Sequence, residues 1–159
     1  GVVQKFGVSI YAPSELDNVM NVCQIDLVQA PFNLIDQRLY TSGWLKKLHD
    51  TGVGIHTRSA FLQGLLLMPK TEIPEKFKQW SSLWSIWHDW LRVNETTAVQ
   101  ACVGFVQSFP QIDKIVLGVD SLNQLQQLII ASKIGHQKVW PTIVSDDENL
   151  INPSNWSNL

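Results

Sequence analysis

The stretch KFGVSIYAPSELDNVM, residues 5–20, decides the fold class of this sequence. It begins with a short run rich in β-branched and aromatic residues, Lys5–Ile10, which predicts a buried strand. A helical pattern follows, in which Leu16 and Val19 share one face and Ser14 is the expected N-cap. A short strand that leads into a helix in this way is typical of a parallel βα unit.

Three later segments repeat this arrangement of a strand followed by a helix. Their strands are predicted at Asp26–Ala30, Val53–Arg58 and Lys114–Leu117. Gly52 and Gly135 are expected to end the helices that follow the second and fourth strands. The alternation predicts an α/β fold built on a parallel sheet.

Two helices carry apolar stripes at helical spacing. In the Trp-rich segment, residues 76–94, the stripe follows steps of four, three and four residues and consists of Trp80, Trp84, Trp87 and Leu91. We interpret it as a packing face, with a platform for stacking a sugar or a base as the alternative. In the helix after the fourth strand, the residues expected near one inward face are Leu122, Leu125, Ile129 and Ala131.

The number of βα units favours half of a closed barrel. Parallel sheets need helices on their faces, and the two main solutions are the open doubly wound sheet and the eight-stranded barrel. The first strand exits into GVSIYAPSE, which has no GxGxxG turn of the nucleotide-binding open sheets. We therefore predict a parallel (βα)4 half of a TIM (β/α)8 barrel with helices on the outer face. It forms one domain over residues 1–159, with an irregular C-terminal strap from about residue 138 to 159.

Composition excludes several classes of function. Charged residues make up 16% of the chain, below the usual value of about 25%. Either the outer surface is unusually apolar, or part of it belongs against another surface. A net charge of −2 without a basic stripe argues against binding to nucleic acid. No signal peptide is recognisable, and the apolar run Leu65–Met68 is too short to span a membrane, so we expect a cytoplasmic protein. Cys23 and Cys102 are predicted to be buried free thiols, and no metal site is expected.

Four motifs resemble consecutive strands of one family. They are FGVSIYAPSEL (residues 6–16), DLVQAPFNLID (26–36), IHTRSAFLQGLL (55–66) and IVLGVDSLNQLQQL (115–128). In this order they resemble the fifth to eighth strands of the aldo/keto reductases, with the loops that follow them. The resemblance covers nearly all of the chain before the tail.

The resemblance implies an oxidoreductase that uses NAD(P)H to reduce a small-molecule carbonyl substrate. In the family, a tyrosine donates the proton, assisted by a lysine, an aspartate and a histidine on the second to fourth strands. Those strands are absent here, and neither Tyr11 nor Tyr40 stands in the proton-donor motif. We therefore assign no catalytic residue to this chain, and interpret His56 as a histidine of the core rather than a catalytic one.

The resemblance also implies which residues bind the cofactor. Ser9 and Gln29 would bind the carboxamide of the nicotinamide ring; the alternative is that they are ordinary polar residues at strand ends. The remaining cofactor-binding candidates lie in the last two units, namely Arg58, Ser59, Phe61, Gln63, Gly118, Asp120, Ser121, Gln124 and Gln127. Gly64 would permit close approach of the backbone to the diphosphate.

The chain departs from the family pattern at three positions and in one segment. Ile10 replaces an asparagine that binds the carboxamide, and Leu128 replaces one that contacts adenine. Arg58 replaces the aromatic residue that stacks under the nicotinamide; it could stack there, bind a diphosphate or an acidic substrate group, or pair with a carboxylate at a strand end. The segment from Gly118 to Leu128 has no lysine or arginine and carries Asp120, so we expect weak NADP preference, NAD use, or weak cofactor binding altogether.

A half-barrel leaves two strand edges and one sheet face open. We expect either a homodimer through these edges or association with the missing N-terminal half. Two other functions stay open. One is a non-catalytic nicotinamide-binding regulatory or redox-sensing subunit, and the other is a different TIM-barrel enzyme.

Overall fold

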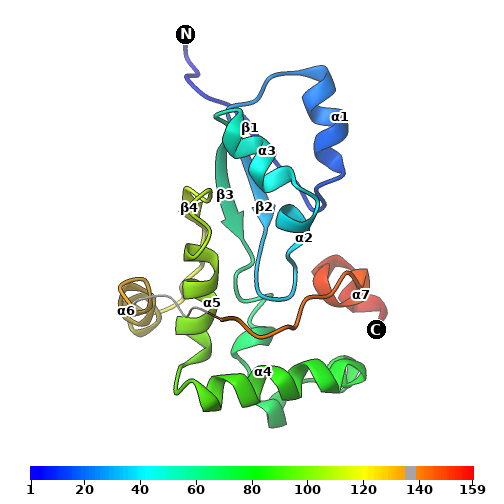
Figure 1. Cartoon of the computed structure of the whole chain (residues 1–159), viewed down its shortest axis with the longest axis vertical. Coiled ribbons are helices and arrows are strands. Elements are labelled where there is room, and N and C mark those ends of the chain that lie inside the picture. Colours follow the sequence, from blue (N-terminus) through cyan, green and yellow to red (C-terminus); the bar gives the residue numbers. More distant parts are fainter. Residues whose placement is uncertain (135–138) are drawn as a thin grey trace.

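A computed structural model of the chain, which describes residues 1–134 and 139–159, contains one parallel sheet (Figure 1). Its strands are hydrogen-bonded in the order in which they follow one another along the chain, and they are β1 (Gly7–Ser9), β2 (Leu27–Pro31), β3 (Gly54–Arg58) and β4 (Lys114–Ile115). All three strand pairs are parallel. The predicted parallel sheet in sequential order is therefore confirmed.

The two edge strands are shorter than the sequence predicts, although hydrogen bonding continues beyond them. Asp26 donates to the carbonyl of Phe6 before β1 begins, and Ile10 donates to the carbonyl of Gln29 after it ends, both at 2.9 Å. At Gly7 a Cβ atom would lie 2.2 Å from the carbonyl oxygen of Leu27. Only glycine therefore allows β1 to approach β2 this closely.

Helices connect the strands and make up the lower part of the molecule in Figure 1. The α-helices are α1 (Glu15–Val22), α2 (Arg38–Thr41), α3 (Trp44–Asp50), α4 (Ser81–Val93), α5 (Ala98–Gln107), α6 (Leu122–Ala131) and α7 (Glu148–Ile151). Shorter 3-10 turns are η1 (Leu65–Leu67), η2 (Lys70–Glu72), η3 (Glu75–Trp80) and η4 (Pro153–Asn158). Gly52 ends α3 with a φ of 75°, as predicted, whereas Gly135 lies outside the described residues.

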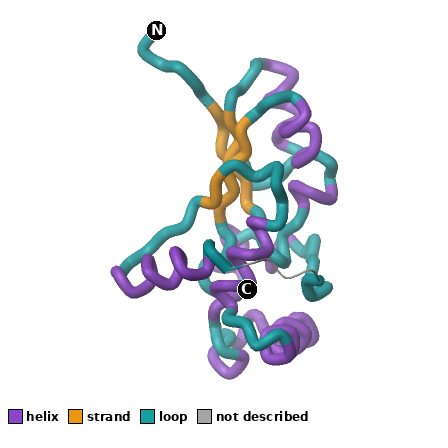
Figure 2. Tube along the Cα trace, turned by 60° about the vertical axis from the view of Figure 1, so that its left-hand side comes forward, coloured by secondary structure: helices purple, strands orange, loops and turns teal. Residues whose placement is uncertain are grey.

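The two faces of the sheet differ in burial. The buried residues of β2 and β3 point toward the helices and are Val28, Ala30, Ile55 and Thr57. The alternate residues are half-buried and form what we call the open face, namely Leu27, Gln29, His56 and Arg58. Figure 2 shows that the helices lying directly beside the strands are on one side of them, whereas the other helices lie below. The open face is therefore the side that would line the interior of a closed barrel.

The first helix begins by a different interaction from the one predicted. Ser14 occupies the N-cap position but its side chain makes no capping hydrogen bond. Instead, Oε1 of Glu15 accepts hydrogen bonds from the backbone N–H groups of Tyr11 and Ala12, both at 2.7 Å. A carboxylate in the first turn also suits the positive end of the helix, which explains why the cap at Ser14 can be dispensed with. The predicted inward residue Leu16 is fully buried.

The tryptophan stripe is a packing face, as predicted. The indole N–H of Trp84 donates to the carbonyl of Phe77 at 2.8 Å, and that of Trp87 donates to the carbonyl of Leu66 at 3.0 Å. Both indoles are buried, and Trp80 and Leu91 pack against the same core. The stripe therefore packs α4 against the loop that follows β3, and it is not a surface on which a sugar or a base could stack.

The predicted inward face of α6 is wrong. Ala131 is buried, but Leu122, Leu125 and Ile129 are 70%, 42% and 46% exposed. Figure 2 shows this helix extending sideways from the rest of the chain. The sequence pattern is that of a packed helix, and the described part of the chain supplies no surface to cover most of its apolar residues.

The tail crosses the molecule and then forms two short helical segments, α7 and η4 (Figure 1). Ser145 donates to the carbonyl of Ile35 at 3.0 Å, and the indole N–H of Trp80 donates to Asp147 at 3.1 Å.

The prediction that both cysteines are buried free thiols is right for Cys102, where burial raises the thiol pKa. It is wrong for Cys23, which is exposed because α1 ends beside it at the surface.

Candidate functional site

A cavity of about 460 Å³ lies where β3 and β4 end and α6 begins. Its lining comes from the loop after β3, from α5, from the segment after β4 and from α6, and consists of Ser59, Ala60, Phe61, Gln63, Gly64, Leu67, Val99, Val116, Leu117, Gly118, Asp120, Gln124, Gln127 and Leu128. We call it the β3–β4 pocket. Carboxyl ends of parallel strands are where ligands bind in such sheets, because the loops there converge.

Most of the predicted cofactor-binding residues meet in this pocket. Those that line it are Ser59, Phe61, Gln63, Gly118, Asp120, Gln124 and Gln127. Ser121 lies at its edge as the N-cap of α6. Ser9, Gln29 and Arg58 lie apart from the pocket lining, at the carboxyl end of the open face. The structure thus divides the predicted site into two neighbouring groups.

The loop after β3 takes an unusual backbone path. Ser59, Leu62 and Gln63 have φ values of 61°, 46° and 53°, in the left-handed region that non-glycine residues seldom occupy. Gly64 continues the path with a φ of 85°, which is the conformation that favours glycine. Such strained positions persist where surrounding structure fixes them, and they cluster at binding sites.

Asn33, which was not among the predicted site residues, fixes this loop from the end of β2. Its Nδ2 donates to the carbonyl of Ser59 at 3.0 Å, and its Oδ1 accepts from the backbone N–H groups of Ile35 and Asp36 at 2.9 Å. Asn33 is 1% exposed. A polar residue directly after a buried strand, within an apolar run, was the signal that could have identified it.

The amino end of α6 forms the wall of the pocket opposite the β3 loop. Oγ of Ser121 accepts from the backbone N–H of Gln124 at 3.2 Å, and Oε1 of Gln124 accepts from the backbone N–H of Asp120 at 2.7 Å. Asp120 is the one charged side chain among the described residues that line the pocket. The pocket therefore has both polar and apolar walls, and the described residues that line it include no cation.

On the open face, Ser9 and Gln29 contact each other. They are partners in the register of β1 and β2, and Oγ of Ser9 donates to Oε1 of Gln29 at 3.3 Å. This bond leaves the amide nitrogen of Gln29 available to a ligand. His56 is the next residue across the sheet from Gln29, and it is half-buried on the open face rather than enclosed in the core.

Arg58 reaches from the end of β3 to the end of β1. Its Nη2 donates to the carbonyl of Ile10 at 3.0 Å and its Nη1 lies 3.2 Å from Oγ of Ser59. The guanidinium carbon lies 4.9 Å from the ring centroid of Tyr11. The ion pairs among the described residues do not include Arg58. The alternative in which Arg58 pairs with a carboxylate at a strand end is therefore wrong.

The two tyrosines lie in surroundings that differ from a proton-donor site. Tyr11 is exposed beside Arg58, and Tyr40 packs edge-on against Phe109 with ring centroids 5.3 Å apart.

Residues 1–134 and 139–159 contain no cluster of three potential metal ligands. None of the helices in these residues has both the length and the apolar character needed to cross a bilayer.

Comparison with solved structures shows the fold. An aldo-keto reductase AKR11C1 from Bacillus halodurans superposes with a TM-score of 0.72 in its apo form and 0.70 in its holo form, at 15% identity. Each match covers 92% of this chain and 54% of the other. The thermostable aldo-keto reductase Tm1743, solved with the inhibitor epalrestat, gives a TM-score of 0.56 at 19% identity. This match covers 83% of the present chain and 44% of the Tm1743 chain.

These structural relatives are TIM barrels, and the chain spans about half of their length. The predicted half of a TIM barrel is thereby confirmed. Comparison with curated proteins gave no significant match. The sequence model of the aldo/keto reductase family matches residues 1–139. This chain therefore belongs to the aldo/keto reductase family.

Proposed function

We propose that this chain is the cofactor-binding half of an NAD(P)-dependent aldo/keto reductase-like oxidoreductase that reduces a carbonyl substrate. The observation that carries the proposal is the β3–β4 pocket, which gathers polar side chains from two separate loops and from α6 at the carboxyl ends of the strands. The catalytic residues of such an enzyme would come from the other half of the barrel.

The pocket fits the adenosine and diphosphate part of a dinucleotide. Its volume of about 460 Å³ lies within the range of about 300–1,000 Å³ typical of small-molecule sites. A helix amino end and the backbone of a loop with positive φ values face the cavity, and both attract phosphate oxygens. A bound dinucleotide would supply the hydride for reduction.

The open-face group suits the nicotinamide end. The amide of Gln29, oriented by Ser9, can donate to the carboxamide oxygen of the ring and thereby select which face of the ring is presented to the substrate. Such fixed orientation raises the rate through positioning. Arg58 borders this end of the site, within hydrogen-bond distance of Ser59, which lines the pocket.

The charge of the pocket favours NAD over NADP. Asp120 stands at the amino end of α6, and the described residues that line the pocket include no lysine or arginine. The 2′-phosphate of NADP carries extra negative charge, which a nearby carboxylate disfavours. We infer that the pocket accepts NADH in preference to NADPH.

The open edges and α6 favour association with another half-barrel. Strands β1 and β4 end the sheet, and Leu122 and Ile130 of α6 are 70% and 58% exposed. Two such half-barrels can close into one barrel, because β4 of the first can pair in parallel with β1 of the second. The partner is either a second copy or an N-terminal half.

A second candidate function is a regulatory subunit that binds a nicotinamide cofactor without catalysis. The surroundings of Tyr11 and Tyr40 do not separate the two candidates, because in both of them a proton donor would have to come from the other half of the barrel. The two candidates share the same binding site. They differ in whether the assembled barrel oxidises NADH when a carbonyl compound is added.

Isothermal titration with NADH and with NADPH tests the proposal. We expect NADH to bind the chain, and Gly118→Trp to weaken binding by about tenfold or more, because a bulky ring at this position occupies the pocket. A Cβ atom at Gly118 meets no other atom within 4 Å, and melting temperatures of the variant show whether the fold also accepts the ring. Val119→Trp, on the neighbouring exposed residue outside the pocket lining, is the matched control. Equal affinity of both variants and the wild type for NADH, or no binding to the wild type, contradicts the proposal.

A further inference from the structure

Arg58 holds its charge at a fixed place on the open face. It alternates along β3 with the buried residues Ile55 and Thr57, so its side chain leaves the strand on the open side. From there it extends past the end of β2 to the carbonyl of Ile10, 3.0 Å away. The hydrogen bond to Ile10 and the contact with the ring of Tyr11 hold the guanidinium in place.

The charge of Arg58 has no counter-ion among residues 1–134 and 139–159. A guanidinium has five N–H donors, and two of those of Arg58 are used by Ile10 and Ser59. A half-buried cation is usually paired, because leaving water costs free energy that a nearby anion offsets. The remaining donors are therefore suited to an anion that is not part of the described chain.

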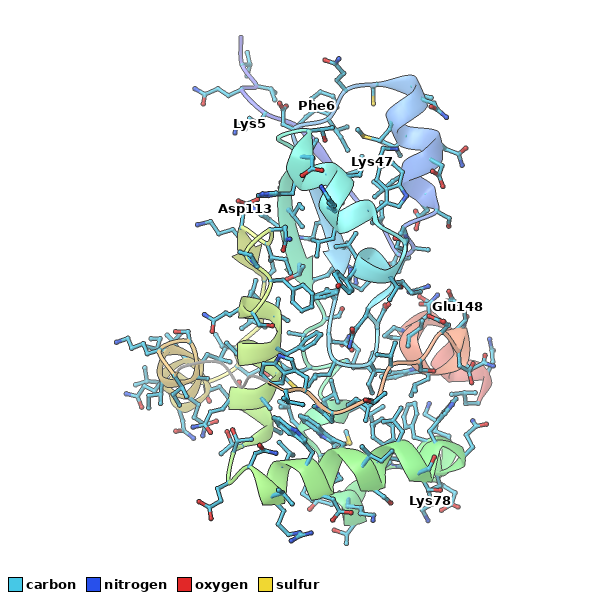
Figure 3. All side chains as sticks on the ribbon, in the orientation of Figure 1. Lys5, Phe6, Lys47, Lys78, Asp113 and Glu148 are labelled. Atoms are coloured by element: carbon cyan, nitrogen blue, oxygen red, sulfur yellow. The ribbon has the colours of Figure 1, made fainter. Side chains whose placement is uncertain are left out.

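Two carboxylates beside the sheet serve its other end. Asp26 accepts from the backbone N–H of Phe6 at 3.0 Å, and Asp113 accepts from the backbone N–H of Ile55 at 2.7 Å. Figure 3 shows Phe6 and Asp113 at the amino ends of the strands, whereas Arg58 ends β3 at the carboxyl end. Lys114, the register partner of His56, adds a second exposed cation on the open face. Arg58 and Lys114 thus give the open face two cations, whereas the carboxylate of Glu15, near Tyr11, is engaged by two backbone N–H groups.

The anion is more consistent with a substrate than with the cofactor. Arg58 is not among the described residues that line the β3–β4 pocket, where the phosphates of a dinucleotide would lie. It lies instead on the face that carries Ser9 and Gln29, at the nicotinamide end of the proposed site. A group bound to Arg58 would therefore lie beside the reacting carbonyl.

We propose that Arg58 binds the carboxylate of an anionic carbonyl substrate, so that 2-oxo acids are the substrate class of this site. The guanidinium fork matches two carboxylate oxygens, and a carboxylate adjacent to the carbonyl would place that carbonyl next to the nicotinamide. This inference rests on the proposed function for the position of the nicotinamide. Arg58 binds and orients in this account and takes no part in proton transfer.

Titration with oxamate tests the proposal on the whole chain with NADH present. Oxamate resembles a 2-oxo acid because its carboxylate is bonded directly to a carbonyl group. We expect oxamate to bind the wild type, Arg58→Gln to weaken its binding by about tenfold or more, and Arg58→Lys to fall between them. Ethyl oxamate, which lacks the charge, should bind all three proteins equally weakly. Arg92→Gln, which removes an exposed arginine paired with Asp89, is the matched control and should bind oxamate as the wild type does.

Three results overturn the inference. They are absence of oxamate binding to the wild type, equal binding of oxamate to Arg58→Gln, and a loss of NADH affinity in Arg58→Gln as large as the loss for oxamate. The last would assign Arg58 to the cofactor. Titrations of oxamate without NADH measure the dependence on Arg58 even if the dinucleotide does not bind, so failure of the proposed function is recognised separately. Melting temperatures of both Arg58 variants show whether the fold is intact.

Discussion

Nδ2 of Asn33 lies 3.0 Å from the carbonyl oxygen of Ser59 and joins the end of β2 to the loop that lines the β3–β4 pocket. Ser59 has a φ of 61° there, a conformation that costs a serine about 1–3 kcal/mol. The hydrogen bond from the buried amide of Asn33 stabilises this conformation of Ser59. The shape of the pocket therefore depends on a residue outside its lining.

Replacing Asn33 with alanine should destabilise the fold and weaken ligand binding together. The change leaves the carbonyl of Ser59 and the N–H groups of Ile35 and Asp36 without their partner, at a cost of about 2–3 kcal/mol. Urea unfolding measures the free energy, and NADH titration measures the affinity. Asn21→Ala, on the exposed end of α1, should change the stability by less than about 0.5 kcal/mol. An Asn33→Ala protein as stable as the wild type would show that the amide has no such role.

Arg38 and Asp36 form a buried pair whose disruption should be costly. Arg38 contacts both oxygens of Asp36 at 2.9 Å, also bonds Glu148 of α7, and has its pKa raised by the hydrogen bond with Asp36. Figure 3 shows Glu148 on α7. Because Asp36 is 1% exposed, Arg38→Gln should lower the free energy of unfolding by about 3 kcal/mol.

The double variant Asp36→Asn with Arg38→Gln tests whether the loss of stability in Arg38→Gln comes from the unpaired carboxylate of Asp36. It should be more stable than Arg38→Gln alone, because no buried carboxylate is left without its cation. Arg92→Gln disrupts an exposed pair with Asp89 and should cost no more than about 0.5 kcal/mol in urea unfolding. A double variant less stable than the single one would contradict the account of the pair.

His88 should make the stability depend on pH in the acid range. Its pKa is lowered, first by burial and then by the charge of Lys70, with Asp89 acting against them. Nε2 is buried without a hydrogen-bond partner among the described residues. Below the ordinary histidine pKa of about 6.5, the unfolded chain takes up a proton that the folded chain resists, so the free energy of unfolding falls as the pH falls.

The comparison that isolates this effect is between the wild type and His88→Gln. Urea midpoints measured between about pH 7.5 and 5.5 should fall more steeply for the wild type than for the variant. His49→Gln, at an exposed histidine of α3, controls for loss of an imidazole. Parallel profiles for the wild type and His88→Gln would refute the prediction.

Replacing Asp120 should change which dinucleotide the pocket prefers. Asp120→Asn removes the one acidic side chain from the described pocket lining, so NADPH affinity should rise by about three- to tenfold while NADH affinity stays nearly constant. Isothermal titration of both cofactors checks this, with Asp146→Asn in the tail as a control for net charge. NADPH binding far more tightly than NADH to the wild type would contradict the inferred preference.

The exposed side of α6 should drive association. Leu122→Glu and Ile130→Glu each place a charge on a residue that is 70% or 58% exposed, and each should lower the mass measured by light scattering at high protein concentration. Asn123→Glu adds the same charge at a polar position of the helix and serves as the control. A wild type that stays monomeric at every concentration would contradict association through copies of this chain.

The strands were predicted because their signals are local. The start of α5 depends on an equally local signal that the sequence analysis did not use: Thr97 and Gln100 form a reciprocal capping box, with bonds of 3.2 and 3.0 Å between side chain and backbone. The pocket residues of the β3 and β4 loops were also found, because each loop is one contiguous motif. Val99 was not found, because it joins the pocket from a helix far away in the sequence.

Other features depend on tertiary contacts between distant segments, which the residue pattern of a single segment does not specify. The apolar spacing of α6 predicts that Leu122 and Leu125 face inward, but the surface they would cover is not in the described chain. Cys23 lies in an apolar sequence and is exposed because α1 ends at the surface. Asn33 follows no rule of periodicity, and its role appears once β2 and the β3 loop are side by side.

The central claim is that the β3–β4 pocket binds a nicotinamide dinucleotide. Amide chemical shifts of the isotope-labelled chain, recorded during a titration with NADH, test it most directly because they register weak binding and locate it. The account predicts that shifts concentrate on residues 59–64 and 116–128, with smaller changes at Ser9 and Gln29. Shifts that are absent, or that gather away from the carboxyl ends of β3 and β4, would contradict it.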